Sequence, residues 1–341
     1  MVGRSTCTRR ASSPGGSVTS GPAALALDIG GTKIAGGLVA ADGTVLLRER
    51  AGTPAHGSAE EVYGAVEQVV SRLKEHPVWQ GVQVAGVGSC GPVHLPGGAV
   101  SPVNIPGWQR FPLAARLAET LGGRVPVRLC GDGVAYAAAE HWLGAARGYT
   151  NALCMVVSTG IGGGLISGGE LLPGPTGNAG HVGHVIVDVD GEPCSCGSVG
   201  CVETIASGPA LVRWATRRGW QPAGAAISTS DLADDARNGH PAARQAFDRA
   251  ALALAAAVVS TAALTEVEVA VVGGGVSGAG EVLFDPLATY LDRMATLPFL
   301  EGLTAVMGEM SGEAGLVGAA RVAFTSLAAG QTGAAAGPET E

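Results

Sequence analysis

Three apolar segments that each run straight into a glycine-rich turn constrain the fold of this chain more than any other feature. The segments span residues 24–27, 152–158 and 267–272, and the turns that follow them are 28–33, 160–164 and 273–275. Adjacent glycines allow sharp turns and a close approach of the backbone to another group. Because strand and helix patterns alternate in both halves of the chain, the sequence predicts an α/β fold with two similar halves.

The hydrophobic spacing and the turn residues place the other elements. Further strands are expected at 34–39, 45–49, 82–88 and 125–130, with a hairpin from 165–166 to 170–172. Helices are expected at 59–74, 113–121, 132–143, 208–218, 241–264, 281–291 and 315–328. Ser58, with Glu61 three residues later, predicts a capping box at the start of the first helix. Residues 1–22 and 329–341 are expected to be disordered tails.

Composition and charge narrow the class of protein. Hydrophobic residues make up 46% of the chain and charged residues 15%, a balance that predicts a folded core. The formal net charge of -8 argues against a nucleic-acid binder that works through a basic surface. The longest apolar run, 250–265, is shorter than the ~20 residues that cross a bilayer, so we expect no membrane span. The sequence shows no apolar stretch typical of a signal peptide, and we expect a cytoplasmic protein.

The glycine-rich turns are candidate phosphate-binding loops. Exposed backbone N–H groups beside glycines can cradle a phosphate, a threonine hydroxyl adds a donor, and Asp28 can hold Mg²⁺ through water. For each turn alone, a plain hairpin is the competing interpretation, but two such turns facing each other would grip both ends of a polyphosphate. The candidate ATP-binding residues are Asp28, Gly30, Gly31, Thr32, Lys33, Thr159, Gly160, Gly162, Gly163, Gly274 and Gly275.

A cluster of cysteines indicates a metal site. Cys194, Cys196 and Cys201 lie within eight residues, and His184 precedes them. Three thiolates and one imidazole suit tetrahedral Zn²⁺ and leave no open coordination position, which indicates a structural site. His181 is the other candidate ligand, and uncoordinated reduced cysteines are the competing interpretation.

Asp132 stands between a predicted strand and a predicted helix. A general base can occupy such a position, although a capping aspartate is the more common occupant.

Taken together, these motifs resemble the ROK family of sugar kinases, and its bacterial glucokinases in particular, over residues 24 to about 328. The matching segments are Asp28-Ile-Gly-Gly-Thr-Lys33, Asn104-Ile-Pro-Gly-Trp108, the glycine run after Thr159, Cys194-x-Cys-Gly-x-x-Gly-Cys-x-Glu203, Val272-Gly-Gly-Gly275 and Glu313-Ala-Gly-Leu-Val-Gly318. The resemblance implies two actin-like (ribonuclease H-like) α/β domains with an ATP and sugar cleft between them. We expect an N-terminal domain at 23–131, joined by a closing helix at 315–328, and a C-terminal domain at 132–314. A homodimer is also implied.

The resemblance also implies roles for individual residues. Asp132 corresponds to the family's catalytic base, which takes the proton of a primary hydroxyl as that oxygen attacks the γ-phosphate of ATP. His184 would bind both zinc and sugar, and Glu203 would contact sugar hydroxyls. Asn104 and the backbone of Gly91 would line the sugar pocket.

Two positions depart from the family pattern. Gly131 stands where the family has an asparagine before the catalytic aspartate, and His181 stands where it has a glutamate. In the family both side chains hydrogen-bond ring hydroxyls, each worth ~1 kcal/mol net, and sites that bind hydroxyls this way discriminate strongly between substrates. Cys90, where the family usually has proline, is a smaller departure.

These departures lead us to expect an ATP-dependent kinase for the primary hydroxyl of an atypical hexose-like substrate. Because imidazole can donate a hydrogen bond, an acceptor carbonyl as in a seven-carbon cyclitol of the valiolone type would fit, and an amino sugar is a further candidate. The alternatives are an ordinary glucokinase and a non-catalytic sugar sensor. A ROK-type repressor would carry a DNA-binding domain of ~60–80 residues before Asp28, where this sequence has 27 residues.

Overall fold

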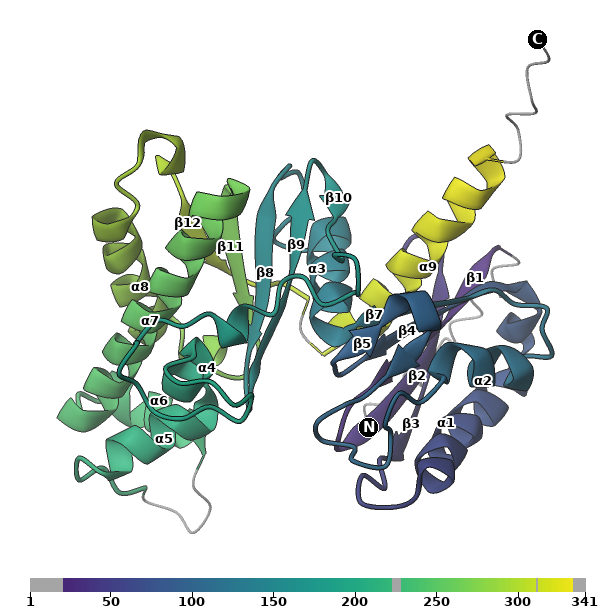
Figure 1. Cartoon of the computed structure of the whole chain (residues 1–341), viewed down its shortest axis with the longest axis horizontal. Coiled ribbons are helices and arrows are strands. Elements are labelled where there is room, and N and C mark those ends of the chain that lie inside the picture. The colour runs from purple at the N-terminus through teal and green to yellow at the C-terminus, as the bar shows by residue number, and fades with distance from the viewer. Residues whose placement is uncertain (1–20, 223–227, 311, 334–341) are drawn as a thin grey trace, which may run out of the picture.

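The computed structural model describes residues 21–222, 228–310 and 312–333, and it contains two five-stranded sheets of the same topology (Figure 1). The first has the order β3-β2-β1-β4-β7 and the second the order β10-β9-β8-β11-β12. In each sheet the first strand pairs antiparallel with the next strand and parallel with a later one. The sequence predicted two similar halves, each beginning with a strand that leads into a glycine turn, and the repeated topology agrees with this.

The strands have the following bounds. The first sheet contains β1 (Ala23–Ile29), β2 (Lys33–Ala40), β3 (Val45–Gly52), β4 (Val82–Ser89) and β7 (Val127–Gly131). The second contains β8 (Ala152–Val157), β9 (Ile161–Ser167), β10 (Glu170–Leu171), β11 (Val269–Gly273) and β12 (Thr304–Met307). A small separate sheet pairs β5 (Val93–His94) with β6 (Ala99–Val100).

The helices are α1 (Ala59–Lys74), α2 (Leu113–Thr120), α3 (Asp132–Leu143), α4 (Val202–Ala206), α5 (Gly208–Thr216), α6 (Thr229–Arg237), α7 (Pro241–Thr265), α8 (Glu281–Met294) and α9 (Ala314–Gly333). The predicted capping box is confirmed, because the Ser58 hydroxyl accepts from the Glu61 amide and the Glu61 carboxylate accepts from the Ser58 amide.

Alternating residues of β1 face two different helix layers of the N-terminal lobe. Leu25 and Leu27 pack in a core that includes residues of α1 and α2, whereas Ala24 and Ala26 pack with alanines of α9. This follows from the two-residue period of a strand, and the small side chains on one face let α9 approach closely. The closing helix thus returns to the N-terminal sheet, as expected.

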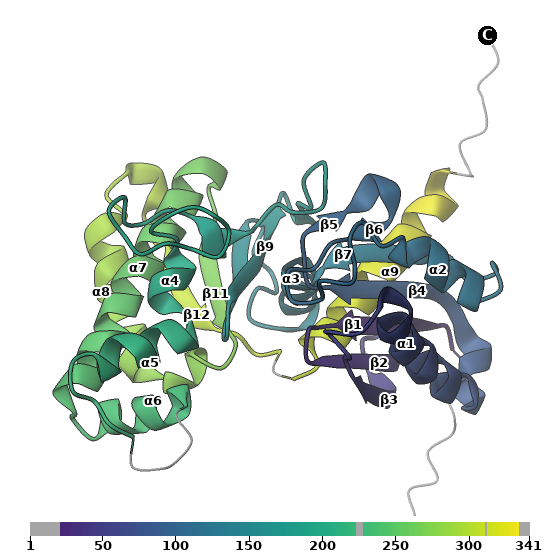
Figure 2. The ribbon, with the colours of Figure 1, turned by 60° about the horizontal axis from the view of Figure 1, so that its bottom comes forward.

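Helices α3 and α9 pack against each other and join the two lobes, and Figure 2 shows α3 between them. Glu140, near the end of α3, forms hydrogen bonds with both chain segments that connect the two lobes. Its carboxylate accepts from the amides of Ala145 (2.8 Å), Met310 (2.9 Å) and Glu309 (3.2 Å). Because this carboxylate is fully buried, these bonds fix both crossings relative to α3.

Helix α7 forms the core of the C-terminal lobe. It is the one helix in the described part of the chain that is long and apolar enough to cross a membrane. The apolar run at 250–265 forms only part of this helix, which has 25 residues and begins at Pro241, as the predicted bounds 241–264 imply. Half of its most apolar window is buried, however, and Phe247, Leu254 and Val258 pack in the lobe's core. Core packing therefore accounts for its apolar sequence.

The predicted strands and helices are present, with bounds that differ by a few residues. Helices α4 and α6 and strands β5, β6 and β12 were not predicted; α4 and the strands are too short to show a period, whereas α6 is amphipathic and has a serine cap at Ser228. Helix α9 continues to Gly333, so the predicted C-terminal tail begins later than residue 329. The predicted tails at 1–20 and 334–341 lie outside the described residues.

Candidate active site

Two aspartates come together at one edge of the N-terminal sheet. Asp28 lies near the end of β1, and Asp132 directly follows β7; both strands pair in parallel with β4, so their carboxyl ends meet. Partial burial raises the pKa of Asp28, and the nearby charge of Asp132 raises it further, while Lys33 opposes both effects. Paired carboxylates of this kind are the hard oxygen ligands that suit Mg²⁺.

Asp132 is the first residue of α3, and its carboxylate accepts from the amide of Gly133 at 2.8 Å. The carboxyl is accessible to solvent, but protein atoms enclose its other sides, and this desolvation raises its pKa. The amide hydrogen bond and the nearby His181 lower the pKa in turn. A carboxylate whose pKa is raised toward neutrality is a better proton acceptor for an alcohol.

Asn104 and Cys90 lie beside these aspartates. The Cys90 thiol donates to Asn104 Oδ1 at 3.1 Å, and a Cβ on Gly31 would lie only 2.6 Å from Asn104 Nδ2. Burial, Asp132 and Asp28 raise the pKa of Cys90 to about 12, which keeps the thiol neutral and able to donate. The structure therefore brings Asn104 against the first glycine turn and places Cys90 beside it.

His181 lies next to Gly91. A Cβ on Gly91 would lie 3.4 Å from His181 Nε2, and His181 Nδ1 is 2.9 Å from the carbonyl oxygen of Asn178. A Cβ on the buried Gly131 would lie at ordinary contact distance from its neighbours, 3.8 Å from the carbonyl oxygen of Gly177 and 4.0 Å from the side chain of Val134. Both departures from the family pattern therefore occur beside Asp132, and Gly131 contributes only backbone there.

Glu203 anchors the second glycine turn. Its carboxylate accepts from the amide of Ile161 at 2.7 Å, and it lies against Gly160. The sequence indicated sugar hydroxyls as partners of Glu203; the structure adds this backbone contact, which only the folded chain reveals.

The glycines of the second turn divide into two groups. Thr159, Gly160 and Gly162 are exposed or partly exposed at the turn between β8 and β9. Gly163 is buried inside β9, where a Cβ would meet the backbone of Cys154 and Gly180, and a Cβ on Gly133 would collide with Gly163. Gly163 therefore lets α3 approach β9 closely, and its role in ATP binding stays a prediction.

The third glycine turn lies against the second. Gly274 has a φ of +89°, which favours glycine, and its Cα faces the backbone of Val157. The Val276 amide donates to the carbonyl of Val157 at 3.0 Å. Gly274 and Gly275 thus join Thr159 and Gly160 on the C-terminal lobe, while Gly30, Gly31, Thr32 and Lys33 form the turn between β1 and β2 of the N-terminal lobe.

The four predicted metal ligands converge. The ligand atoms of His184, Cys194, Cys196 and Cys201 all lie within 4.8 Å of one another. Two of these separations, Cys196 Sγ to Cys201 Sγ and Cys194 Sγ to His184 Nδ1, are 3.7 Å. A tetrahedron with Zn–S bonds of about 2.3 Å has edges of about 3.8 Å, so the cluster fits Zn²⁺. His181 lies outside the cluster, with its ring 6.2 Å from that of His184.

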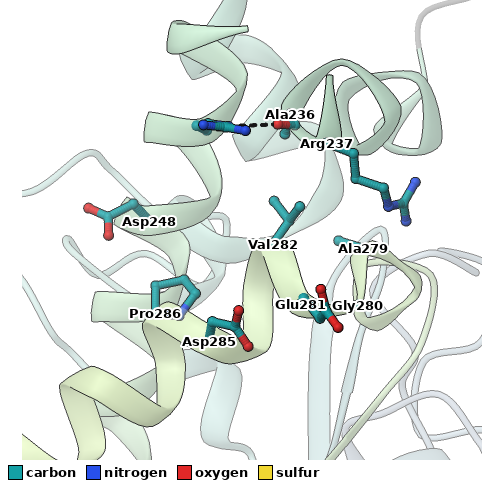
Figure 3. A pocket seen from close by; sticks show the side chains of 10 residues that line it. Ala236, Arg237, Asp248, Ala279, Gly280, Glu281, Val282, Asp285 and Pro286 are labelled. Carbon is teal, nitrogen blue, oxygen red and sulfur yellow. Dashed lines mark hydrogen bonds between the residues drawn. The ribbon is translucent and has the colours of Figure 1, made fainter. Parts of the chain in front are cut away.

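A cavity of about 710 Å³ opens in the C-terminal lobe beyond the third glycine turn (Figure 3). It is lined by Ala236, Arg237, Arg244, Asp248, Ala279, Gly280, Glu281, Val282, Asp285 and Pro286. Arg237 donates to the carbonyl of Gly278 at 2.7 Å, which ties α6 to the segment after the turn. The sequence did not predict this cavity, because it forms only where α8 packs beside the consecutive helices α6 and α7.

Comparison with known proteins agrees with this geometry. The model of the ROK family matches residues 24–325. An N-acetylmannosamine kinase of Escherichia coli O7:K1 is 38% identical over 301 residues, which cover 88% of this chain and 98% of the relative. A glucokinase of Thermotoga maritima is 32% identical over 311 residues, which cover 87% of this chain and 96% of the relative.

Solved structures share the fold. A ROK family glucokinase from Streptomyces griseus, solved in complex with glucose and AMPPNP, has a TM-score of 0.76 and 33% sequence identity, covering 89% of this chain and 99% of that one. The predicted fold of two actin-like α/β domains is thereby confirmed. The family match spans nearly the whole described chain and several relatives exceed 30% identity over most of their length, so this chain belongs to the ROK family.

Proposed function

We propose a substrate class and a division of labour for this ATP-dependent ROK sugar kinase. Its reaction would move the γ-phosphoryl group of ATP to the primary hydroxyl of a hexose-like substrate that differs from glucose. The observation that carries the proposal is the position of Asp132, beside Asp28 on one side and beside the wall of His181 and Gly91 on the other. Phosphate chemistry and sugar recognition would therefore meet at this carboxylate.

In this mechanism Asp132 accepts the proton of the primary hydroxyl. The hydroxyl oxygen forms a bond to the γ-phosphorus, the bond from that phosphorus to the bridging oxygen breaks, and ADP leaves. Its raised pKa makes Asp132 a suitable general base. Mg²⁺, when bound, would neutralise charge on the phosphates, and Asp28 is the residue that would hold it.

The nucleotide would span the two lobes. We assign the γ-phosphate end to the turn of Gly30, Gly31 and Thr32, and the other phosphates to Thr159 and Gly160. The adenosine end would follow Gly274 and Gly275 toward the cavity at Ala279 and Gly280, which continues the same segment. Lys33 and Gly162 would border the two phosphate turns.

A structural Zn²⁺ would hold the loop that carries the residues proposed to contact the sugar. His184, Cys194, Cys196 and Cys201 have the spacing for it, and Cys201 begins the segment that leads to Glu203. Burial and neighbouring thiols raise the pKa of Cys201 to about 12, so a metal would have to displace protons on binding. The metal would thus stabilise the position of Glu203 and of the turn that Glu203 anchors.

The altered wall favours a substrate that differs from glucose near Gly131. An N-acylated amino sugar is our first candidate, because Gly131 lacks the side chain of the family's asparagine, which would leave room for additional bulk, and an N-acetylmannosamine kinase is 38% identical. A seven-carbon cyclitol of the valiolone type is the second candidate. Ordinary glucose is the alternative, and it would require other residues to replace the two missing side chains. A non-catalytic sugar sensor is the remaining alternative, and a homodimer remains a family-based prediction.

The test is ATP turnover with a panel of acceptors. Purified protein with Mg²⁺ and ATP is offered glucose, mannose, N-acetylmannosamine, N-acetylglucosamine and a valiolone-type cyclitol, and ADP formation is measured against the Asp132→Asn variant. We expect an N-acetylhexosamine to give the highest kcat/KM. Glucose as the best acceptor would support the alternative, and sugar binding without any turnover would contradict the kinase and support a sensor.

A further inference from the structure

Asn178 connects His181 to the N-terminal lobe. Its backbone carbonyl lies 2.9 Å from His181 Nδ1. Its side chain makes two hydrogen bonds to Val93 of β5: Oδ1 accepts from the Val93 amide at 3.0 Å, and Nδ2 donates to the Val93 carbonyl at 2.8 Å. The Leu95 amide donates to the carbonyl of Thr176 at 3.0 Å, which extends the same pairing. One residue therefore holds both the histidine ring and the strand that follows Gly91.

The bond from Asn178 determines which nitrogen of His181 carries the proton. A backbone carbonyl can only accept, so Nδ1 must donate and must be protonated. In the neutral ring the other nitrogen, Nε2, is then bare and can only accept. That nitrogen lies on the side of Gly91, and the ring is close enough to Asp132 to affect the pKa of its carboxyl. A bare acceptor therefore faces the place proposed for the sugar.

We propose that His181 Nε2 is a specificity-determining hydrogen-bond acceptor for the substrate, and that Asn178 is the positioning residue that makes it one. This deepens the proposed function and rests on it. The substrate must present a donor at this point, either a hydroxyl or an amide N–H. A ring carbonyl does not fit, because it would face a lone pair; this removes the reason for preferring a valiolone-type ketone over an amino sugar or hexose.

The same geometry explains how a histidine can replace a carboxylate here. Both groups accept a hydrogen bond, but neutral imidazole does so without adding a third negative charge beside Asp28 and Asp132. The two hydrogen bonds between Asn178 and Val93 hold the histidine ring in one orientation. Orientation matters because a hydrogen bond weakens steeply when its angle changes. Because Val93 belongs to the N-terminal lobe and Asn178 to the C-terminal lobe, the wall is complete only when both lobes hold it.

The first experiment pairs substrate and protein changes. The best acceptor from the panel is compared with its monodeoxy analogues, in mildly alkaline buffer where free imidazole is neutral, for wild type and for His181→Phe, His181→Glu and His181→Lys. We expect one analogue to lower kcat/KM of wild type by about 10-fold, the worth of ~1.4 kcal/mol, and to have little effect in His181→Phe. His181→Glu should keep the preference for the donor, and His181→Lys should lose it. An equal penalty in wild type and His181→Phe would overturn the proposal.

The second experiment tests Asn178 without needing a substrate. Nitrogen NMR of ¹⁵N-histidine-labelled protein reports which ring nitrogen is protonated, and the His181→Phe spectrum assigns the signal. We expect Nδ1–H in wild type and a mixture of both tautomers in Asn178→Ala, with Asn238→Ala as a matched control on an exposed asparagine after α6. A signal with the proton on Nε2 in wild type would overturn the proposal even if the protein is a kinase. If no acceptor is phosphorylated, the proposed function fails while the tautomer is still measured.

A kinetic measurement separates positioning from general stability. Asn178→Ala should raise KM for the acceptor about 10-fold and leave kcat within about 2-fold, because Asp132 is untouched. Asn178→Asp keeps the acceptor for the Val93 amide but loses the donor, and should fall between wild type and Asn178→Ala. A parallel loss of kcat and thermal stability in Asn178→Ala, with KM unchanged, would mean that Asn178 only supports the fold.

Discussion

The two sides of the candidate site are built in different ways. On the phosphate side, Asp28, Gly30 and Gly31 belong to one short motif, and Asp132 joins them because β1 and β7 both pair with β4. On the sugar side, Gly91 and His181 belong to segments that meet only through contacts between lobes.

This difference explains where the sequence departs from its family. Strand ends of a parallel sheet place the phosphate side, so any change there would disturb both fold and chemistry. On the sugar side, His181 lies outside both sheets, so it can change the specificity without disturbing a strand. Gly131 is the last residue of β7, and its change leaves the strand in place because it only removes a side chain. The tests below act first on the phosphate side and then on the sugar side.

The largest effect is expected at Asp132. Asp132→Asn should lower kcat by roughly 10²–10⁴, the usual contribution of a general base, while the fold is kept. Circular dichroism and the melting temperature serve as the control for folding. Near-full activity of this variant would show that Asp132 is not the general base. It would also contradict the proposal that phosphate chemistry and sugar recognition meet at this residue.

Removal of the metal should act on the sugar side. Replacing Cys194, Cys196 or Cys201 by serine should release about one zinc ion per chain and lower Tm on the order of 5–10 °C, because the loop that leads to Glu203 loses its anchor. Cys154→Ala, a change in the core of the C-terminal lobe, is the control and should keep the metal. Absence of zinc from wild type in metal analysis would disprove the site.

Restoring the family residues tests whether the wall sets specificity. Gly131→Asn with His181→Glu should raise kcat/KM for glucose about 10-fold and depress activity on the preferred acceptor, because the new side chains can bond ring hydroxyls. A Cβ fits at Gly131 at ordinary contact distance from its neighbours. The two changes are close and need not add, so both single variants are measured as well. A wild-type KM for glucose well below millimolar would already contradict an atypical substrate.

The smallest effect concerns pH and stability. Burial and Asp132 raise the pKa of Asp28 in the folded protein, so the folded state binds a proton more tightly than the unfolded state does. Asp28 therefore destabilises the protein at neutral pH, and stability recovers as the pH falls from the raised pKa toward the ordinary value of about 3.9. Asp28→Asn should raise Tm at pH 7 by ~1–3 °C, and this gain should shrink in acid. A lower Tm at pH 7 would show that the carboxylate is stabilising.

Much of the fold followed from local pattern. The capping box at Ser58, the strand before Asp28 and the start of α3 at Asp132 were all predicted, because each depends on neighbours within a few residues. Helix α4 was missed because five residues carry too little periodicity, whereas α6 has an apolar face and a cap at Ser228 that could have indicated it. The start of the C-terminal tail was placed too early because α9 continues beyond the residues with a clear apolar pattern.

Site residues divide in the same manner. The cluster of candidate metal ligands was predictable, since three of them lie in one turn-rich segment with suitable spacing. The packing of Gly163 was missed because a glycine run looks alike whether it binds phosphate or admits a helix, and only the fold shows that Gly133 lies against it. Asn178 was missed altogether, because nothing near it in the sequence indicates a partner.

The sequence by itself determined the two-fold α/β plan, the positions of the glycine turns and the identity of Asp132, because strand alternation and glycine placement are local properties of the chain. Only the tertiary structure decided that Asp28 and Asp132 share one sheet edge, that Gly163 packs against α3 and that His181 Nε2 is an acceptor. The last of these depends on Asn178, which forms hydrogen bonds with Val93, 85 residues earlier in the sequence. The physical reason is that hydrogen-bond direction and desolvation arise between segments, and no pattern within one segment encodes them.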